Sequence, residues 1–236
     1  VIALRKNQMM NAFALLLTAQ GTPCLLAGDE FFNSQKGNNN VYCQDNETGW
    51  VNWTRLKTDD SLFRYVQSLI AFRRAHPCLH KSEPLRGLDR TACGVPDVSF
   101  HGENAWQVRS DFSSRQLGVM YSGSEVDDDE CFIAYNMHWI PHSYALPFPG
   151  KKKAWFLAAD TARGILKEPV LLENQKSTEL PERSIAVMIG RKNDEDTEAE
   201  PSAARRSRRK KSKKQADAGK VGNNEGSKTF LHDNKA

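Results

Sequence analysis

Eight side chains in a polar stretch from Gly28 to about Thr58, here called the 28–58 loop, have the clearest capacity for chemistry. They comprise acids, amides and one phenol: Asp29, Glu30, Asn38, Asn39, Asn40, Tyr42, Asp45 and Asn46. A pair of carboxylates can act as general acid and general base. Amides offer both donors and acceptors, which suits a neutral ligand rich in hydroxyl groups. The loop therefore predicts binding of a hydroxylated ligand, with or without acid–base catalysis.

The adjacent carboxylates Asp29 and Glu30 fit a supporting role better than a catalytic one. Neighbouring residues that leave an extended strand point to opposite sides, so these two carboxylates do not face each other across a bond. We expect them to order the loop by accepting hydrogen bonds. Direct contact with a ligand remains the alternative.

The amides and aromatic rings of the loop each allow two interpretations. Asparagine caps turns and tolerates left-handed backbone, so Asn38–Asn40 could serve turn formation or ligand contact. Gln44, Asp45 and Asn46 share both interpretations. We favour packing against the base of the loop for Trp50 and Trp53 over stacking on a ligand, whereas Tyr42 is open to either role.

Metal and cofactor chemistry is not predicted anywhere in the sequence. His138 and His142 have the spacing of a helical metal pair, but Pro141 and the β-rich surroundings argue against a helix, so we assign them a structural role. Five scattered cysteines form no CxxC pair. That pattern favours reduced thiols in a cytosol over a zinc site or a disulfide framework.

The elements around the loop alternate between helix and strand. Apolar residues recur at a helical period in residues 1–20, and Gly21 is a typical helix stop. Thr22–Ala27 predicts a buried strand because it is short and apolar throughout. A second helix is predicted from about residue 60 to Pro77, with Asp59, Asp60 or Ser61 as its cap. One parallel strand between two helices needs neighbouring strands, so we expect the end of a larger βα array.

The remaining sequence changes character twice. Six short β-rich runs separated by turn residues occupy residues 84–190 and are typical of an antiparallel sheet or sandwich. Residues 191–236 carry 13 Lys and Arg against 8 Asp and Glu with few apolar side chains, which predicts a disordered tail. Its basic run, Arg205–Lys214, lacks interleaved aromatics, so we favour a solvated tail over nucleic-acid binding or an electrostatic anchor.

Four segments of the sequence resemble a known family. "LLTAQGTPCLLAGDEFFNSQKGNNNVYCQDNETGWVNW" (16–53) is similar to the last-strand region of glycogen debranching enzymes and isoamylases, in the α-amylase family of glycoside hydrolases. "PDVSFHG", "FIAYNMHWIPHSYALP" and "ERSIAVMIG" resemble the C-terminal β domain of the same group. The similarity runs from about Val1 to Gly190.

The resemblance implies both a fold and an activity. The fold is the C-terminal end of a (β/α)8 barrel in residues 1–83, an antiparallel β-sandwich in 84–190 and the disordered tail in 191–236. The activity is hydrolysis of α-1,6-glucosidic branch linkages in glycogen, amylopectin or limit dextrin. We assign no catalytic residue here, because the family's nucleophilic Asp and acid/base Glu belong to earlier strands and their motifs do not occur in this sequence.

Partners and location follow from the same reading. The eight loop residues named first become candidate glucan contacts. We expect no cofactor. We also expect no membrane partner, since no apolar run approaches the roughly 20 residues of a membrane span, and the cysteine pattern favours a cytoplasmic location. A noncatalytic carbohydrate-binding or interaction module is the alternative. Because Val1 already lies within a helical pattern, we expect the natural chain to extend upstream.

Overall fold

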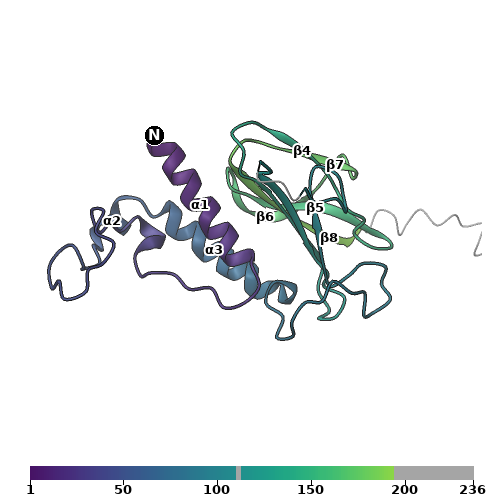
Figure 1. Ribbon diagram of the computed structural model, residues 1–236, viewed down its shortest axis with the longest axis horizontal. Coiled ribbons are helices and arrows are strands. Elements are labelled where there is room, and N and C mark those ends of the chain that lie inside the picture. The colour runs from purple at the N-terminus through teal and green to yellow at the C-terminus, as the bar shows by residue number, and fades with distance from the viewer. Residues whose placement is uncertain (110–112, 194–236) are drawn as a thin grey trace, which may run out of the picture. The chain divides into compact units, whose positions relative to one another are not determined.

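Two long helices form where the apolar periodicity predicts them. A computed structural model describes residues 1–109 and 113–193 (Figure 1). The helical elements are α1 (Ile2–Thr18), η1 (Asp29–Phe31), α2 (Thr54–Thr58), α3 (Ser61–Ala75) and η2 (Pro77–Leu79). Helices α1 and α3 pack together through a buried cluster built from Phe13, Leu17, Leu62, Tyr65, Val66 and Leu69. The N-cap of α3 is Asp60, one of the three predicted caps, and the Asp59 carboxylate accepts a hydrogen bond from the backbone N–H of Ser61 at 3.0 Å.

The segment Thr22–Ala27 is not a buried strand, and this prediction is wrong. It has no strand geometry, and every residue in it except Pro23 is exposed, including Leu26 at 57%. A buried parallel strand needs hydrogen-bonded neighbours at its edges. Within the described residues no strand pairs with this segment, so apolar composition alone does not make it a strand.

Arg73 of α3 joins the two helices through three backbone carbonyls. Its guanidinium donates to the carbonyl oxygens of Leu17 at 2.9 Å, Ala19 at 2.6 Å and Gly21 at 2.6 Å. The last carbonyls of a helix lack partners within the helix. Arg73 satisfies them at the end of α1 and fixes the turn that follows.

The six predicted β-rich runs all form strands, and the structure adds two more. The strands are β1 (Val98–His101), β2 (Gln116–Tyr121), β3 (Glu130–Asn136), β4 (His142–Ala145), β5 (Lys153–Asp160), β6 (Gly164–Leu171), β7 (Ser177–Leu180) and β8 (Ser184–Lys192). Strand β6 is a half-exposed edge strand with Pro169 and charged residues, and β7 is four mostly polar residues long. Neither has the apolar pattern of a strand, because an edge or a short surface strand buries little.

The strands form two antiparallel sheets. The larger has the order β1-β2-β3-β8-β5-β6, and the smaller pairs β4 with β7. All of these pairings are antiparallel, as predicted. The division at residue 83 and the barrel end remain predictions. The predicted disordered tail lies outside the described residues, apart from positions 191–193.

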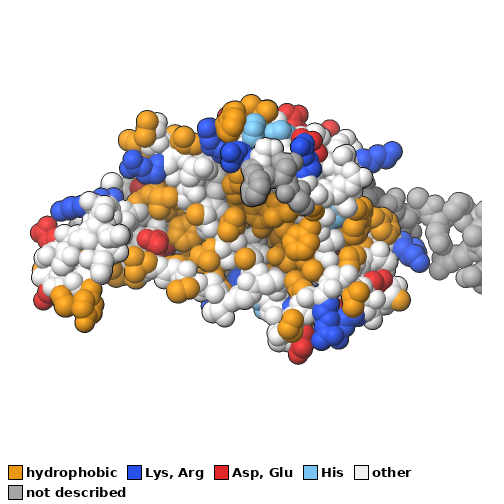
Figure 2. All heavy atoms as spheres, viewed as in Figure 1, with side chains coloured by type: hydrophobic (Ala, Val, Ile, Leu, Met, Phe, Trp, Pro, Cys, Tyr) orange, Lys and Arg blue, Asp and Glu red, His pale blue; other side chains and the backbone are white. Residues whose placement is uncertain are grey.

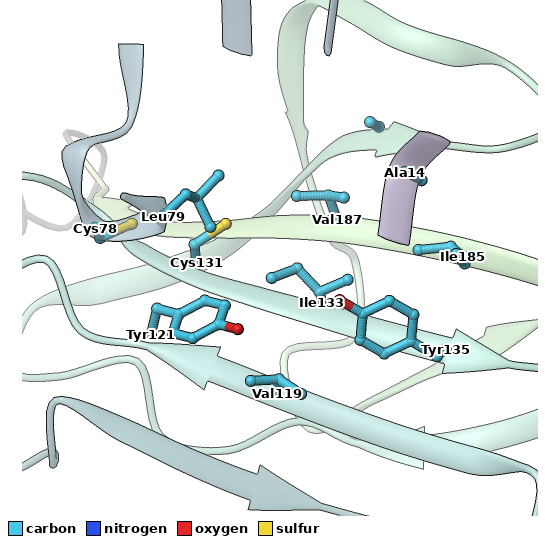
Figure 3. Close-up of a cluster of buried hydrophobic side chains, with 11 residues drawn as sticks. Ala14, Cys78, Leu79, Val119, Tyr121, Cys131, Ile133, Tyr135, Ile185 and Val187 are labelled. Atoms are coloured by element: carbon cyan, nitrogen blue, oxygen red, sulfur yellow. The ribbon is translucent and has the colours of Figure 1, made fainter. Parts of the chain in front are cut away.

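Each face of the six-stranded sheet is covered by its own apolar core. One face packs Val119, Ile133 and Val187 against Ala14 of α1 and Leu79 of η2 (Figure 3). The other face packs Phe132, Trp155 and Met188 against Tyr144 of β4 and Leu180 of β7. Alternate residues of β3 contribute to both cores, so all seven of its residues are buried. Among the described residues, no helix is both long and apolar enough to cross a membrane.

Asp97 holds the chain segment that enters β1, and its replacement tests this role. Its carboxylate is 2% exposed and accepts backbone N–H bonds from Arg86 at 2.8 Å, Gly87 at 2.7 Å and Leu88 at 3.2 Å. Burial acts to raise the pKa of Asp97, but these donors outweigh it and lower the pKa overall. Stability contributed by Asp97 is therefore present above the usual carboxyl pKa and is lost as the pH falls through the lowered value.

We expect Asp97→Asn to reduce the free energy of unfolding at neutral pH by about 2 kcal/mol, because the amide N–H₂ opposes a backbone N–H donor. Urea denaturation measures this change. The exposed Asp127→Asn is the matched control. Equal stability of the two variants would contradict the role assigned to Asp97.

Candidate functional site

The base of the 28–58 loop is a fixed platform formed by its two ends. Gly28 has φ 99°, and its carbonyl accepts from the N–H groups of Phe31 at 3.1 Å and Asn33 at 2.9 Å. Phe31 is 1% exposed and stacks on Trp53 with ring centroids 5.4 Å apart. The Asn33 side chain accepts from the N–H of Asn52 at 3.0 Å. These contacts close the loop at its base.

Asp29 and Glu30 both lie in η1, at the start of the loop. The Glu30 carboxylate accepts from the N–H of Gly28 at 2.9 Å, so it bonds back to the turn that precedes it. Asp29 lines a hollow of about 370 Å³ together with apolar side chains of α1 such as Met9 and Phe13. The two carboxylates thus have different surroundings. Glu30 orders the loop, whereas ligand contact by either residue stays a prediction.

Asn38 and Asn40 use their side-chain oxygens in consecutive turns. Asn38 accepts from the N–H of Asn40 at 2.9 Å, and Asn40 accepts from the N–H of Tyr42 at 3.0 Å. Gln44 accepts from the Asn38 amide at 3.0 Å and donates to the Asn40 carbonyl at 3.0 Å. The turns present Asn39 and Tyr42 to solvent, with Tyr42 83% exposed. Of this group, Asn39 and Tyr42 are the side chains best placed for an external ligand.

Asp45 and Asn46 stabilise the second half of the loop. The Trp50 indole donates to Asp45 at 2.9 Å, and Asn46 accepts from the N–H of Thr48 at 2.9 Å. Trp50 is 56% exposed and Trp53 is 64% exposed. Each ring thus has one contact within the loop and a large solvent-facing surface, so packing and ligand stacking are both compatible with this arrangement.

Three residues that fix the loop were missed in the sequence. They are Phe31, which stacks on Trp53, Asn33, which bonds to Asn52, and Arg55, which donates to the Phe32 carbonyl at 2.9 Å. Their partners lie about 20 residues away along the chain. A local pattern carries no signal of such pairings.

The histidine pair lies outside the loop: His138 is two residues past the end of β3, and His142 begins β4. His138 stacks on Trp139 at 4.2 Å, and His142 pairs with Glu103 at 3.1 Å. Across the part of the chain that the structure describes, no three His, Cys, Asp or Glu side chains are grouped to hold a metal ion. The side chains that the loop carries on its fixed backbone turns can form hydrogen bonds with a ligand and stack on it.

Gly28→Ala tests whether the base of the loop is as constrained as its geometry indicates. An added Cβ would lie 2.6 Å from Cβ of Asn33 at a φ that disfavours side chains. We expect the variant to open the loop, with faster proteolysis between residues 33 and 52 and a cost of about 2 kcal/mol. Gly37→Ala is the control, since Gly37 has φ 86° but open space around it. Equal cleavage of both variants would show that strain alone, and not the contact with Asn33, governs the loop.

Comparison with known proteins relates these features to a group of enzymes. The chain is 48% identical over 120 residues to the glycogen debranching enzyme of Dickeya chrysanthemi, covering 51% of this chain and 18% of that protein. It is 29% identical over 168 residues to an isoamylase of Flavobacterium sp., covering 69% of this chain and 22% of the isoamylase. No family model matches the chain.

A solved structure supports the fold. The pullulanase from Bacillus acidopullulyticus superposes with a TM-score of 0.62 at 17% identity, covering 80% of this chain and 21% of the pullulanase. The chain spans less than a third of the length of the curated relatives reported above. The resemblance predicted from residues 16–53 is confirmed, and the chain is a relative of the glycogen debranching enzymes and isoamylases of the α-amylase family of glycoside hydrolases.

Proposed function

We propose that this chain is part of a debranching glycosidase that hydrolyses α-1,6-glucosidic linkages in a branched α-glucan such as glycogen, amylopectin or limit dextrin. The observation that carries the proposal is the 48% identity to a glycogen debranching enzyme over a stretch of 120 residues. The 28–58 loop adds support, because its fixed turns present amide and phenol groups suited to sugar hydroxyls.

In this proposal residues 1–83 are the end of a (β/α)8 barrel, and residues 84–190 are the β-sandwich domain beside it. Thr22–Ala27, which is irregular in this structure, would become the last strand of the barrel only when neighbouring strands of the same polypeptide pair with it. Support comes from the apolar hollow between α1 and the exposed Leu25 and Leu26, which neighbouring strands could cover. The 28–58 loop would follow the carboxyl end of that strand. In such barrels the ligand face lies at these ends.

The proposed roles of the loop residues are in substrate binding. Asn38, Asn39, Asn40, Tyr42, Asp45 and Asn46 hold the glucan, directly or through the turns they form. Asp29 and Glu30 order the loop, Glu30 through its bond to the N–H of Gly28. Retaining glycosidases need two carboxyl groups about 5 Å apart on either side of the bond. We place this acid and nucleophile in polypeptide that the sequence does not contain. The five free cysteines favour a cytoplasmic location.

Electrophoresis of the chain through gels containing glycogen tests the substrate-binding role. We expect glycogen to retard the chain, and Tyr42→Ala and Asn39→Ala to weaken that retardation several-fold. Trp139→Ala is the control, because Trp139 is 58% exposed but lies outside the loop. Full retardation of both loop variants would overturn the role of the loop.

Two further outcomes separate the alternatives. Loss of retardation in Trp139→Ala alone would favour a noncatalytic carbohydrate-binding module in the β domain. Release of reducing ends from a branched dextrin by the chain alone would overturn the placement of the acid and nucleophile outside this sequence.

A further inference from the structure

The turn between β4 and β5 holds an aromatic ring in solvent on an anchored backbone. Phe148 is 52% exposed, whereas Pro147 and Pro149 on either side of it are buried. The Pro147 carbonyl accepts a hydrogen bond from the Trp155 indole at 2.7 Å. Pro149 packs on Gly190 of β8 so closely that a Cβ added to Gly190 would lie 2.9 Å from Cβ of Pro149. Because proline also fixes φ on both sides, a rigid turn presents Phe148 to solvent.

Five basic residues lie next to this turn at one end of the six-stranded sheet. Lys151, Lys152 and Lys153 follow the turn, and Arg191 and Lys192 end β8. The antiparallel register places Lys153 opposite Lys192. Side chains in opposite positions share one face of the sheet, and like charges there repel each other. Figure 2 shows Lys and Arg side chains at the right of the view, around the point where the described chain ends.

Two carboxylates neutralise part of this charge. Glu130 of β3 is 2% exposed and pairs with Lys153. Asp129 beside it is attracted to Lys153 and Arg191, which act to lower its pKa, although burial raises the pKa overall. Both carboxylates thus act on Lys153 and Arg191.

The other three lysines stay uncompensated. Lys151, Lys152 and Lys192 are exposed, and no Asp or Glu among the described residues forms an ion pair with them. Together with Phe148 they form a patch with one apolar ring and three ammonium groups. A ligand that complements this patch needs an apolar surface beside negative charge.

A sugar chain that carries phosphate has both features. The C–H face of a pyranose ring is apolar and can cover an aromatic ring. A phosphate monoester carries a charge of about −1.5 to −2 at neutral pH, and the lysine ammonium binds phosphate as a point charge. A neutral glucan has no group that pairs with three cations. Single-stranded nucleic acid has such groups, but its binding sites stack successive bases on several aromatic rings, and this patch has one.

We propose that Phe148, Lys151, Lys152 and Lys192 form a surface site for phosphate monoesters on an α-glucan chain, termed the phosphoglucan site. The inference rests on the proposed function, because a branched glucan is the ligand expected of a relative of glycogen debranching enzymes. It adds the class of glucan, one that carries phosphate groups, and a second contact outside the 28–58 loop. The patch would hold the polymer at its phosphate groups while the loop binds neutral glucose units.

Electrophoresis through gels that contain a phosphorylated amylopectin tests the site, with the same polymer after phosphatase treatment as the matched ligand. Mobility in a gel without polymer is the reference. We expect the phosphorylated polymer to retard the 236-residue chain more strongly than the treated one. Combined Lys151→Gln and Lys152→Gln should weaken retention by the phosphorylated polymer about fivefold and leave retention by the treated polymer unchanged, because exposed ion pairs are individually weak. Lys192→Gln should act in the same direction with a smaller effect.

The control for these variants is the combined Arg163→Gln and Lys167→Gln, which removes two exposed cations at β6 and makes the same change in net charge. Because Lys151 and Lys152 are exposed and without ion pairs, both combined variants should melt at the temperature of the unaltered chain. Equal loss of retention in the two combined variants would show that net charge alone governs binding, and it would overturn the site.

Substitutions at Phe148 separate the ring from the charges. Phe148→Ala should weaken retention by the phosphorylated polymer several-fold, whereas Phe148→Trp should keep it, because an indole preserves the stacking surface. Phe100→Ala is the control, since Phe100 is 53% exposed on β1. Unchanged retention of Phe148→Ala would overturn the assignment of the patch to a sugar chain.

Comparison of the two polymers distinguishes failure of this inference from failure of the proposed function. Equal retention by the phosphorylated and the treated polymer overturns the phosphoglucan site and leaves the proposed function standing. Retention by the phosphorylated polymer alone supports the site and counts against glucan binding by the 28–58 loop. No retention by either polymer counts against both.

Two further measurements identify other sources of anion binding. A full-length variant with Gln in place of every Lys and Arg in Arg205–Lys214 tests the basic run. If this variant alone loses the preference for the phosphorylated polymer, the preference belongs to the basic run and the site is overturned. Binding of a single-stranded DNA oligonucleotide that Lys151→Gln and Lys152→Gln abolish, without a preference for the phosphorylated polymer, would assign the patch to nucleic acid and also overturn the site.

Discussion

Arg73→Met is expected to lower the free energy of unfolding by about 4 kcal/mol, because three carbonyls lose a charged donor. The guanidinium of Arg73 is buried and bonds to the carbonyl oxygens of Leu17, Ala19 and Gly21. Methionine keeps most of the apolar stem but donates no hydrogen bond. The carbonyls at the end of α1 would then stay unpaired or draw water into the interface between α1 and α3.

Urea denaturation monitored by circular dichroism measures the loss at Arg73. Arg74→Met supplies the matched control, since Arg74 is the exposed neighbour on the same helix and the chemical change is identical. Arg73→Lys should fall between the two, because one ammonium group cannot reproduce the planar guanidinium fork. If Arg73→Met were as stable as Arg74→Met, the three hydrogen bonds from Arg73 to backbone carbonyls would have no energetic role.

Acidification from about pH 6.5 to about pH 4 is expected to remove about 3 kcal/mol of stability through His101. The ring is fully buried, its Nδ1 accepts from the N–H of Trp106 at 2.8 Å, and Nε2 lies 2.9 Å from the Ser99 hydroxyl. Because Nδ1 accepts, the proton of the neutral ring is on Nε2 and is donated to Ser99. Burial lowers the pKa of His101 from 6.5 to about 4.

The sign of this pH dependence follows from which state binds the proton. Below about pH 6.5 the unfolded chain protonates His101 while the folded chain does not, so the unfolded state gains stability until the folded pKa is reached. His101→Gln should therefore flatten the decline in unfolding free energy over this range, whatever its stability at neutral pH. His80→Gln, at an exposed histidine, is the control. A His101→Gln profile parallel to that of the unaltered chain would refute the assignment.

The helices and the principal strands could be predicted because each carries its own local pattern. Helix α3 has a helical apolar period and begins after Asp60, one of its predicted caps, and β3 has a continuous apolar run. Such patterns depend on neighbours within a few residues, so sequence contains them in full. The types of residue in the 28–58 loop were equally visible, and they carried the resemblance to debranching enzymes.

Thr22–Ala27, β6 and β7 could not be assigned correctly because strand formation depends on partners distant in the chain. An apolar segment without a hydrogen-bonded neighbour stays irregular, whereas the polar edge segment Gly164–Leu171 becomes a strand because β5 pairs with it. The loop shows the same limit. Sequence identified Asn38–Asn40 and Tyr42, but tertiary contacts decide that Asn38 and Asn40 form turns while Tyr42 faces solvent.

The sequence by itself determined the local elements, the residue types of the candidate site and the relationship to debranching enzymes, since these depend on composition and order along the chain. Tertiary structure alone decided which carbonyls Arg73 satisfies, that the His101 ring is buried, and where a hollow forms between α1 and β2. Those features depend on the meeting of segments tens of residues apart, and no local pattern records such a meeting.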